Sequence, residues 1–139
     1  MDRDKLIAFT RDFTAAFNRN DLDAVMSYFA DEAVYDEFDG TVSRGREAVR
    51  AAFEPQFAGA FGRMVFNEED CFADAEAGRA LITWTVTLEV KGRPVGWQGL
   101  DILHVENDLI TRKLTYAKAK APLFQAVDGP KGPSSETRD

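Results

Sequence analysis

The chain has 139 residues, of which 45% are hydrophobic and 11 are Phe, so its length and apolar content suit one domain with one core. The formal net charge is -7 and the sequence pI is about 4.7. The phosphate backbone of DNA or RNA would repel such an acidic surface, which argues against nucleic-acid binding.

Three further features bear on where the protein works. Cys71 is the only cysteine and cannot form an internal disulfide, which favours a reducing compartment. Residues 1–5 lack the apolar core of a signal peptide. No apolar run reaches the ~20 residues that a membrane-spanning helix needs. We therefore expect a soluble cytoplasmic protein with no membrane partner.

Two helices are predicted at the start of the chain. Apolar residues recur at helical spacing over residues 3–18, and residues 18–20 break the pattern. Asp21 is a favourable N-cap for a second, short helix. The buried side of that helix would consist of Leu22, Val25, Met26 and Phe29.

A short strand and a third helix follow. Residues 33–38 predict a strand, and the pair Asp39 and Gly40 is typical of a turn. The third helix is predicted over residues 47–57, with Pro55 near its end.

The second half of the chain predicts strands. They cover residues 64–72, 79–90, 95–105 and 109–118, and turn residues separate them. Residues 128–139 are rich in Gly, Pro and Ser and are expected to be a disordered tail, which leaves residues 1–127 as a single domain. Helices followed by a meander predict an α+β fold, with the helices covering one face of a curved antiparallel sheet.

Turn positions decide which strand residues share a face of this sheet. With Gly92 and Arg93 as the first turn, Trp84 lies opposite Asp101; with Asn107 and Asp108 as the second, Asp101 lies opposite Leu114. One predicted face collects Ile82, Trp84, Val86, Leu88, Trp97, Asp101, Leu103, Ile110, Leu114 and Tyr116. The other collects Thr83, Thr85, Thr87, Glu89, Gln98, His104, Thr111, Lys113 and Thr115. The first, mostly apolar face is the one that the helices would cover.

Two acidic residues stand in apolar surroundings. Asp101 interrupts the apolar strand of residues 95–105, and Glu37 ends the segment after the second helix. Because desolvation of a carboxylate is costly, such an acid is either paired or used in chemistry. Asp101 is thus either a pocket acid or the ion-pair partner of Arg112, which lies diagonally opposite it on the neighbouring strand. Glu37 faces a pocket or is a solvated loop residue, and Asp36 faces the opposite side.

Four short segments, in this order and spacing, carry a resemblance to a known family. They are residues 18–23, 29–34, 45–50 and 99–101. Together with the order of elements over residues 6–118, they resemble the nuclear transport factor 2-like superfamily, in its SnoaL-like and ketosteroid isomerase-like branch. The resemblance implies a cystatin-like cone, in which a strongly bent sheet wraps three helices and leaves a deep pocket at the open end.

The resemblance also implies roles for the two acids. In ketosteroid isomerases a carboxylate after the second helix shuttles a proton, and a second acid, kept protonated by its apolar site, donates a hydrogen bond to the developing enolate. Glu37 and Asp101 match these catalytic positions. The usual tyrosine of the first helix is replaced by Phe13, which cannot donate a hydrogen bond. The isomerase constellation is therefore incomplete, although Tyr116 offers a donor on the diagonal of Asp101.

A pocket in this cone would have aromatic and apolar walls. The substrate-binding candidates are Phe13, Phe17, Trp84, Trp97, Leu114 and Tyr116. The same residues suit a core without any ligand, because aromatic side chains dominate protein cores in general. One His and one Cys are too few for a metal site, and no Gly-rich phosphate loop is present. We expect neither a metal nor a cofactor.

Three hypotheses of function remain open. The first is an enzyme that acts on a small hydrophobic ligand by proton transfer, of isomerase, cyclase, dehydratase or hydrolase type. The second is a module that binds a hydrophobic metabolite without turnover, and the third is a structural dimer with an incidental cavity. In each case we expect a homodimer through the convex face of the sheet, where Leu81, Leu100 and Ile102 lie among Thr residues.

Overall fold

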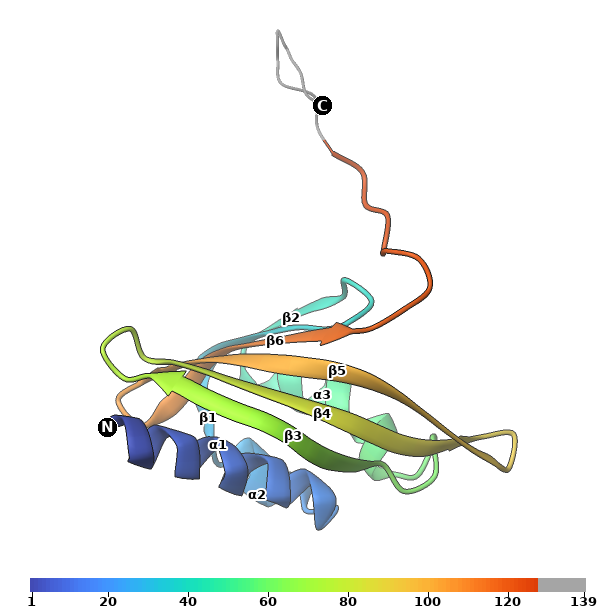
Figure 1. Cartoon of the computed structure of the whole chain (residues 1–139), viewed down its shortest axis with the longest axis horizontal. Coiled ribbons are helices and arrows are strands. Elements are labelled where there is room, and N and C mark those ends of the chain that lie inside the picture. Colours follow the sequence, from blue (N-terminus) through green and yellow to red (C-terminus); the bar gives the residue numbers. More distant parts are fainter. Residues whose placement is uncertain (128–139) are drawn as a thin grey trace, which may run out of the picture.

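The computed structural model describes residues 1–127, which form a curved sheet that wraps around helices (Figure 1). The helices are α1 (Arg3–Asn18), α2 (Leu22–Met26) and α3 (Arg46–Phe57). The strands are β1 (Phe29–Asp36), β2 (Val42–Arg44), β3 (Val65–Asp74), β4 (Arg79–Val90), β5 (Arg93–Glu106) and β6 (Leu109–Ala117). The tail predicted for residues 128–139 lies outside the described residues.

Side-chain caps fix where the first two helices begin. The Asp2 carboxylate accepts a hydrogen bond from the Lys5 amide at 2.8 Å, and Asp21 accepts one from the Ala24 amide at 3.0 Å. Each cap satisfies an amide that has no partner within the helix. The second helix ends earlier than predicted, because Phe29 already pairs with Ile110 as the first residue of β1.

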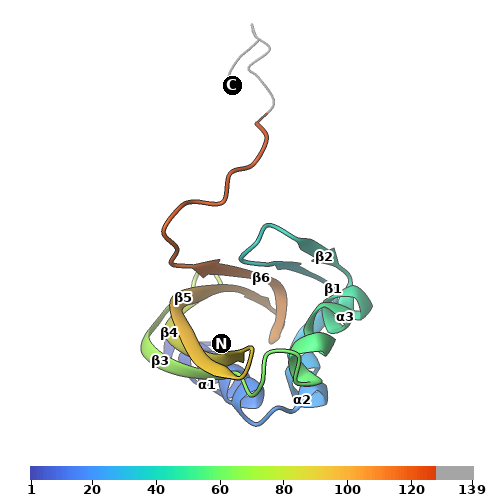
Figure 2. The same ribbon diagram turned by 90° about the vertical axis from the view of Figure 1, so that its right-hand side faces the viewer.

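The sheet is mixed rather than purely antiparallel. Its strand order is β2-β1-β6-β5-β4-β3, and β1 runs parallel to β6 while the other neighbours are antiparallel. Seen from its end, the sheet is strongly curled, and α1 and α3 lie along its open side (Figure 2). The α+β cone predicted by the sequence is confirmed, with this parallel pair and the short strand β2 as additions.

The register between β4 and β5 differs from the predicted one by two residues. The turn is formed by Lys91 and Gly92, so Asp101 pairs with Ile82 instead of Trp84. A shift of two residues keeps every side chain on its predicted face, because strand side chains alternate with a period of two. Trp84 and Asp101 therefore still point to the concave side, where both are buried.

The register between β5 and β6 changes faces part of the way along. Next to the turn, Val105 pairs with Ile110 as predicted, but His104 then pairs with Arg112, which leaves Thr111 as an extra residue. The Thr111 hydroxyl donates to the His104 carbonyl at 3.3 Å within this β-bulge. One added residue reverses all later side chains of the strand. Lys113 and Thr115 consequently face the concave side, while Leu114 and Tyr116 face outward.

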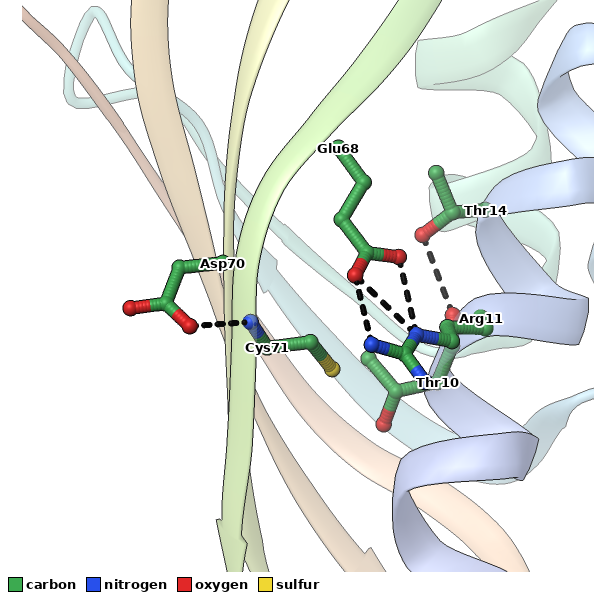
Figure 3. A network of polar contacts seen from close by, with 6 residues as sticks. All are labelled: Thr10, Arg11, Thr14, Glu68, Asp70 and Cys71. Carbon is green, nitrogen blue, oxygen red and sulfur yellow. Dashed lines mark hydrogen bonds and ion pairs between the residues drawn. The ribbon is translucent and has the colours of Figure 1, made fainter.

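A polar clamp and an aromatic core hold α1 against the sheet. The Arg11 guanidinium donates to both carboxylate oxygens of Glu68 on β3, at 2.8–3.0 Å (Figure 3). Beneath this bidentate pair, Phe13 and Phe17 are buried and stack edge to face at a centroid distance of 5.2 Å.

None of the helices within residues 1–127 is long and apolar enough to cross a bilayer.

Candidate functional site

A pocket of about 500 Å³ lies between the helices and the concave face of the sheet. Its walls come from α1, α3 and every strand except β2. The lining residues are Thr14, Phe17, Tyr35, Glu37, Phe38, Asp39, Ala52, Phe53, Pro55, Gln56, Phe61, Met64, Phe66, Trp84, Leu88, Val90, Trp97, Asp101, Lys113 and Thr115. The volume falls within the range of small-molecule binding sites, and most of the wall is apolar.

Asp101 forms a buried ion pair with Lys113 at the inner end of this pocket. Lys113 Nζ lies 3.1 Å from Asp101 Oδ1, and the two side chains are 5% and 9% exposed. The Thr115 hydroxyl donates to the same oxygen at 2.7 Å, and Trp84 Nε1 donates to Asp101 Oδ2 at 3.2 Å. A carboxyl group that accepts three hydrogen bonds, one from an ammonium, is an ionised carboxylate.

Aromatic rings surround the Lys113 ammonium on its other sides. Nζ lies 4.4 Å from the ring centroid of Tyr35, 5.6 Å from that of Phe53 and 5.7 Å from that of Phe17. Burial alone would lower the pKa of Lys113, but the Asp101 carboxylate and Tyr35 outweigh it and the pKa is raised. Lys113 is therefore a cation under physiological conditions, with an aromatic cage and one carboxylate as its surroundings.

Glu37 stands apart from this pair, just after the end of β1. Its side chain is half-buried and lines the pocket, and burial, followed by repulsion from Asp39, raises the pKa of its carboxyl group. The attraction of Lys113 opposes this shift only in part. Its neighbour Asp36 does not line the pocket and instead forms a hydrogen-bonded ion pair with Arg112.

The structure brings most, but not all, of the predicted site residues together. Glu37, Asp101, Phe17, Trp84 and Trp97 line the pocket. Phe13 is fully buried behind it, where its ring stacks on the rings of Phe17, Tyr28 and Phe29.

Two predicted wall residues lie on the other side of the sheet. Leu114 and Tyr116 were expected to face the pocket, and this placement is wrong, because the bulge at Thr111 turns both outward. Tyr116 is 51% exposed and cannot supply the donor that Phe13 lacks. The proposed Asp101–Arg112 pair is wrong for the same reason: Lys113 takes that place.

Among the lining residues that the sequence analysis did not predict, three belong to the surroundings of the Asp101–Lys113 pair: Tyr35, Lys113 and Thr115. Tyr35 lies on β1 two residues before Glu37, so alternation along the chain was a usable signal for it. Burial raises the pKa of the Tyr35 phenol, which therefore stays protonated as a hydrogen-bond donor. Lys113 and Thr115 had no such signal, because their place depends on the bulge.

Nothing in the described part of the chain forms a cluster of three or more His, Cys, Asp or Glu side chains that could hold a metal ion. The pocket does present several functional side chains of its own. They are a titratable carboxyl group at Glu37, a fixed cation at Lys113 and a hydroxyl donor at Tyr35.

The chain is similar to several solved structures of the same fold. A proposed polyketide cyclase from Xanthomonas campestris superimposes with a TM-score of 0.76 at 21% identity, over 84% of this chain and 92% of that one. A nuclear transport factor 2-like protein of unknown function from Burkholderia pseudomallei gives a TM-score of 0.72 at 17% identity, over 81% and 90% of the two chains. A protein with a ketosteroid isomerase-like fold from Catenulispora acidiphila, solved in complex with trimethylamine, gives 0.69 at 17% identity, over 78% and 83%. At these identities the likeness establishes the fold alone.

No curated protein matches the chain. The sequence model of one family does match, over residues 10–113, and its description is SnoaL-like domain. This span runs from α1 through most of β6 and contains both Asp101 and Lys113. The chain belongs to the SnoaL-like domain family.

Proposed function

We propose that the protein binds a small hydrophobic molecule with a carbonyl or similar group in its pocket and catalyses a proton transfer on it. The observation that carries this proposal is Glu37, a half-buried carboxyl group on a largely apolar pocket wall with a raised pKa. General acid–base catalysis works best when the pKa of the group has moved towards the working pH. Glu37 would take a proton from the ligand and return it at another atom.

In this proposal Asp101 does not have the role that the resemblance implied, namely that of a protonated acid that donates a hydrogen bond to the ligand. An acid that accepts hydrogen bonds from Lys113, Thr115 and Trp84 has no proton of its own to donate. In this proposal Asp101 is a positioning residue that orients Lys113, and the donors towards the ligand are Lys113 and Tyr35. The reaction thus uses one carboxyl group as proton carrier instead of two.

The relatives support a small-molecule site without naming the ligand. One structural neighbour is a proposed polyketide cyclase and another was solved with trimethylamine. The apolar wall of the present pocket, including Phe66, Trp84 and Leu88, favours a flat or cyclic hydrophobic body. We therefore expect substrates among small cyclic enones, lactones and epoxides.

Substitution of Glu37 by Gln tests the proton transfer. Gln keeps the size and hydrogen-bonding shape of the side chain but carries no titratable proton. Once a turned-over compound is found in such a panel, Glu37→Gln should lower kcat by roughly 10²–10⁴-fold and leave ligand affinity nearly unchanged. Steady-state kinetics and calorimetric binding give the two numbers separately.

The neighbouring residue provides the matched control. Asp36→Asn makes the same chemical change one position earlier, on the outward side of β1, and should leave kcat unaltered. An activity that survives Glu37→Gln undiminished would remove Glu37 from the mechanism. Ligand binding without turnover of any compound would leave the protein a binding module.

A further inference from the structure

Lys113 is a buried cation in a pocket whose other charged lining residues, Glu37, Asp39 and Asp101, are all acids. We propose that Lys113 determines the specificity of this pocket, by binding an anionic oxygen of the ligand such as a carboxylate, enolate or phenolate. This inference rests on the proposed function in one respect only, namely that a small molecule enters the pocket. It does not depend on turnover.

The hydrogen bonds of Lys113 leave room for one more acceptor. An ammonium group has three N–H donors. Within residues 1–127 two oxygen atoms accept from it: Asp101 Oδ1 at 3.1 Å and Thr115 Oγ1 at 2.7 Å. The rings of Tyr35, Phe53 and Phe17 lie around it, and the Tyr35 phenol also helps to raise the pKa of Lys113. A ligand oxygen that reaches Nζ would supply the missing third acceptor.

The charge of Lys113 is only partly compensated by Asp101. The Asp101 carboxylate also accepts from the Thr115 hydroxyl and the Trp84 indole, so three donors share its negative charge. An additional anion beside Lys113 would lie in an apolar environment, where a charge-assisted hydrogen bond is stronger than in water. Aromatic rings that would otherwise attract a cationic ligand are already occupied by Lys113 itself.

The other charged groups of the pocket decide how such a ligand is oriented. Glu37 and Asp39 line the pocket beside the exposed Phe38, and both would repel an anion. Lys113, which is 4% exposed, lies at the buried end. An anionic group is therefore directed inward to Lys113, where the ammonium offsets the repulsion of the Asp101 carboxylate beside it, and the apolar body of the ligand lies against Trp84, Phe66 and Leu88. The ligand class is a small, flat hydrophobic molecule with one acidic oxygen.

The probes for this proposal are 2-naphthoate and 2-naphthamide, which have nearly the same shape and differ in charge at neutral pH. Isothermal titration calorimetry of the full chain should show that 2-naphthoate binds about tenfold to 100-fold more tightly, since a hydrogen bond to a charged group exceeds a neutral one by such a factor. This preference is measured on the unaltered protein and does not depend on how any variant folds. Equal affinities, or a preference for the amide, would overturn the proposal.

Two variants assign the preference to Lys113. The double substitution Asp101→Asn with Lys113→Met removes both charges together, so no unpaired buried charge remains, and should abolish the preference for 2-naphthoate. Arg112→Gln removes a cation from the adjacent position of β6, outside the pocket, and should retain it. A preference that persists in the double variant would exclude Lys113 as its cause.

Glu37→Gln separates this proposal from catalysis: it should remove turnover and keep the preference for 2-naphthoate.

Discussion

At the scale of single residues, the chemistry of the site depends on how the buried charge of the Asp101 carboxylate is neutralised by its partners. A buried charge is tolerated when a partner and further hydrogen bonds satisfy it, and strongly destabilising when the partner is lost. Asp101 meets the first condition through Lys113, Thr115 and Trp84. The same contacts place a cation in the pocket, so the pair serves both stability and ligand recognition in our proposal.

Asp101→Asn should therefore be strongly destabilising, although Asn is nearly isosteric with Asp. It leaves the Lys113 ammonium buried beside a neutral amide, and loss of one partner of a buried pair lowers the free energy of unfolding by about 3–5 kcal/mol. Urea denaturation followed by tryptophan fluorescence measures this difference. Asp36→Asn breaks the more exposed pair with Arg112 and should lower the free energy of unfolding by about 1 kcal/mol or less. Similar values for the two variants would contradict the view that Asp101 is held as a buried ion.

Glu37 should make the stability of the protein depend on pH in a defined direction. The carboxyl group ionises near its ordinary pKa of 4.5 in the unfolded chain and at a higher pH in the folded protein. Between these two pKa values the folded state binds more protons, so its stability falls as pH rises through that window and stays lower above it. Below pH 4.5 both states are protonated and the effect vanishes.

Glu37→Gln removes this dependence. In thermal melts at a series of pH values, the melting temperature of the variant should rise relative to that of the unaltered protein as pH increases through the window. At lower pH the difference between the two melting temperatures should not change. Glu32→Gln, at an exposed position on β1, is the control for the loss of one negative charge. A constant difference between Glu37→Gln and the unaltered protein at all pH values would mean that the carboxyl group of Glu37 is not perturbed.

At the scale of elements, the helices and turns that depend on local sequence patterns could be predicted from the sequence. Periodic apolar residues and the caps Asp2 and Asp21 determine α1 and α2, and the turn at Asn107 and Asp108 was identified correctly. The error of two residues in the predicted β4–β5 register did not affect the prediction of which side chains face the helices, because side chains alternate with a period of two. The predicted face of Asp101 is therefore the observed one, whereas Glu37, which also lines the pocket, was indicated by the family resemblance.

The bulge in β6 marks the limit of that reasoning. Residues 109–117 have apolar and polar side chains in both alternating sets, so the strand has no clearly apolar face, and one extra residue changes its inner set without any visible signal. What selects the observed register is tertiary: Lys113 meets the carboxylate of Asp101 only if Thr111 is skipped. A contact between residues of two strands cannot be read from the pattern of either strand alone.

Gly99 on β5 is a position where one added methyl group should disturb the site. A Cβ atom there would clash with the Tyr116 carbonyl oxygen and lie 2.7 Å from the Trp84 ring, so that the strand or the indole would have to move. Gly99→Ala should lower the free energy of unfolding by about 1–3 kcal/mol, as overpacking does, and shift the indole that donates to Asp101. Chemical denaturation tests the stability. Gln98→Ala, whose side chain is exposed, is the control and should be nearly neutral; equal effects would refute the packing argument.

At the scale of the whole molecule, the outer face of the sheet is more apolar than the sequence suggested. The bulge moves Leu114 and Tyr116 onto it in exchange for Lys113 and Thr115. Direct pairings then form an apolar row across four strands, made of Phe72, Leu81, Ile102 and Leu114. Leu100 and Tyr116 pair beside it, and the side chains of Phe72 and Tyr116 are 48% and 51% exposed. An exposed row of this kind, among Thr residues, suits the core of a protein interface.

We therefore expect the protein to form a homodimer in which this row packs against the same row of a second copy. Sedimentation velocity should show a dimer for the unaltered chain. Ile102→Glu puts a like charge near its symmetry mate in an apolar contact and should produce monomers, while binding of 2-naphthamide in the pocket on the opposite face persists. Thr87→Glu adds the same charge to the outer face away from the row and should leave the dimer intact. A monomer for the unaltered chain at micromolar concentration would contradict this assembly, and dissociation by both variants would point to net charge rather than to the row as its cause.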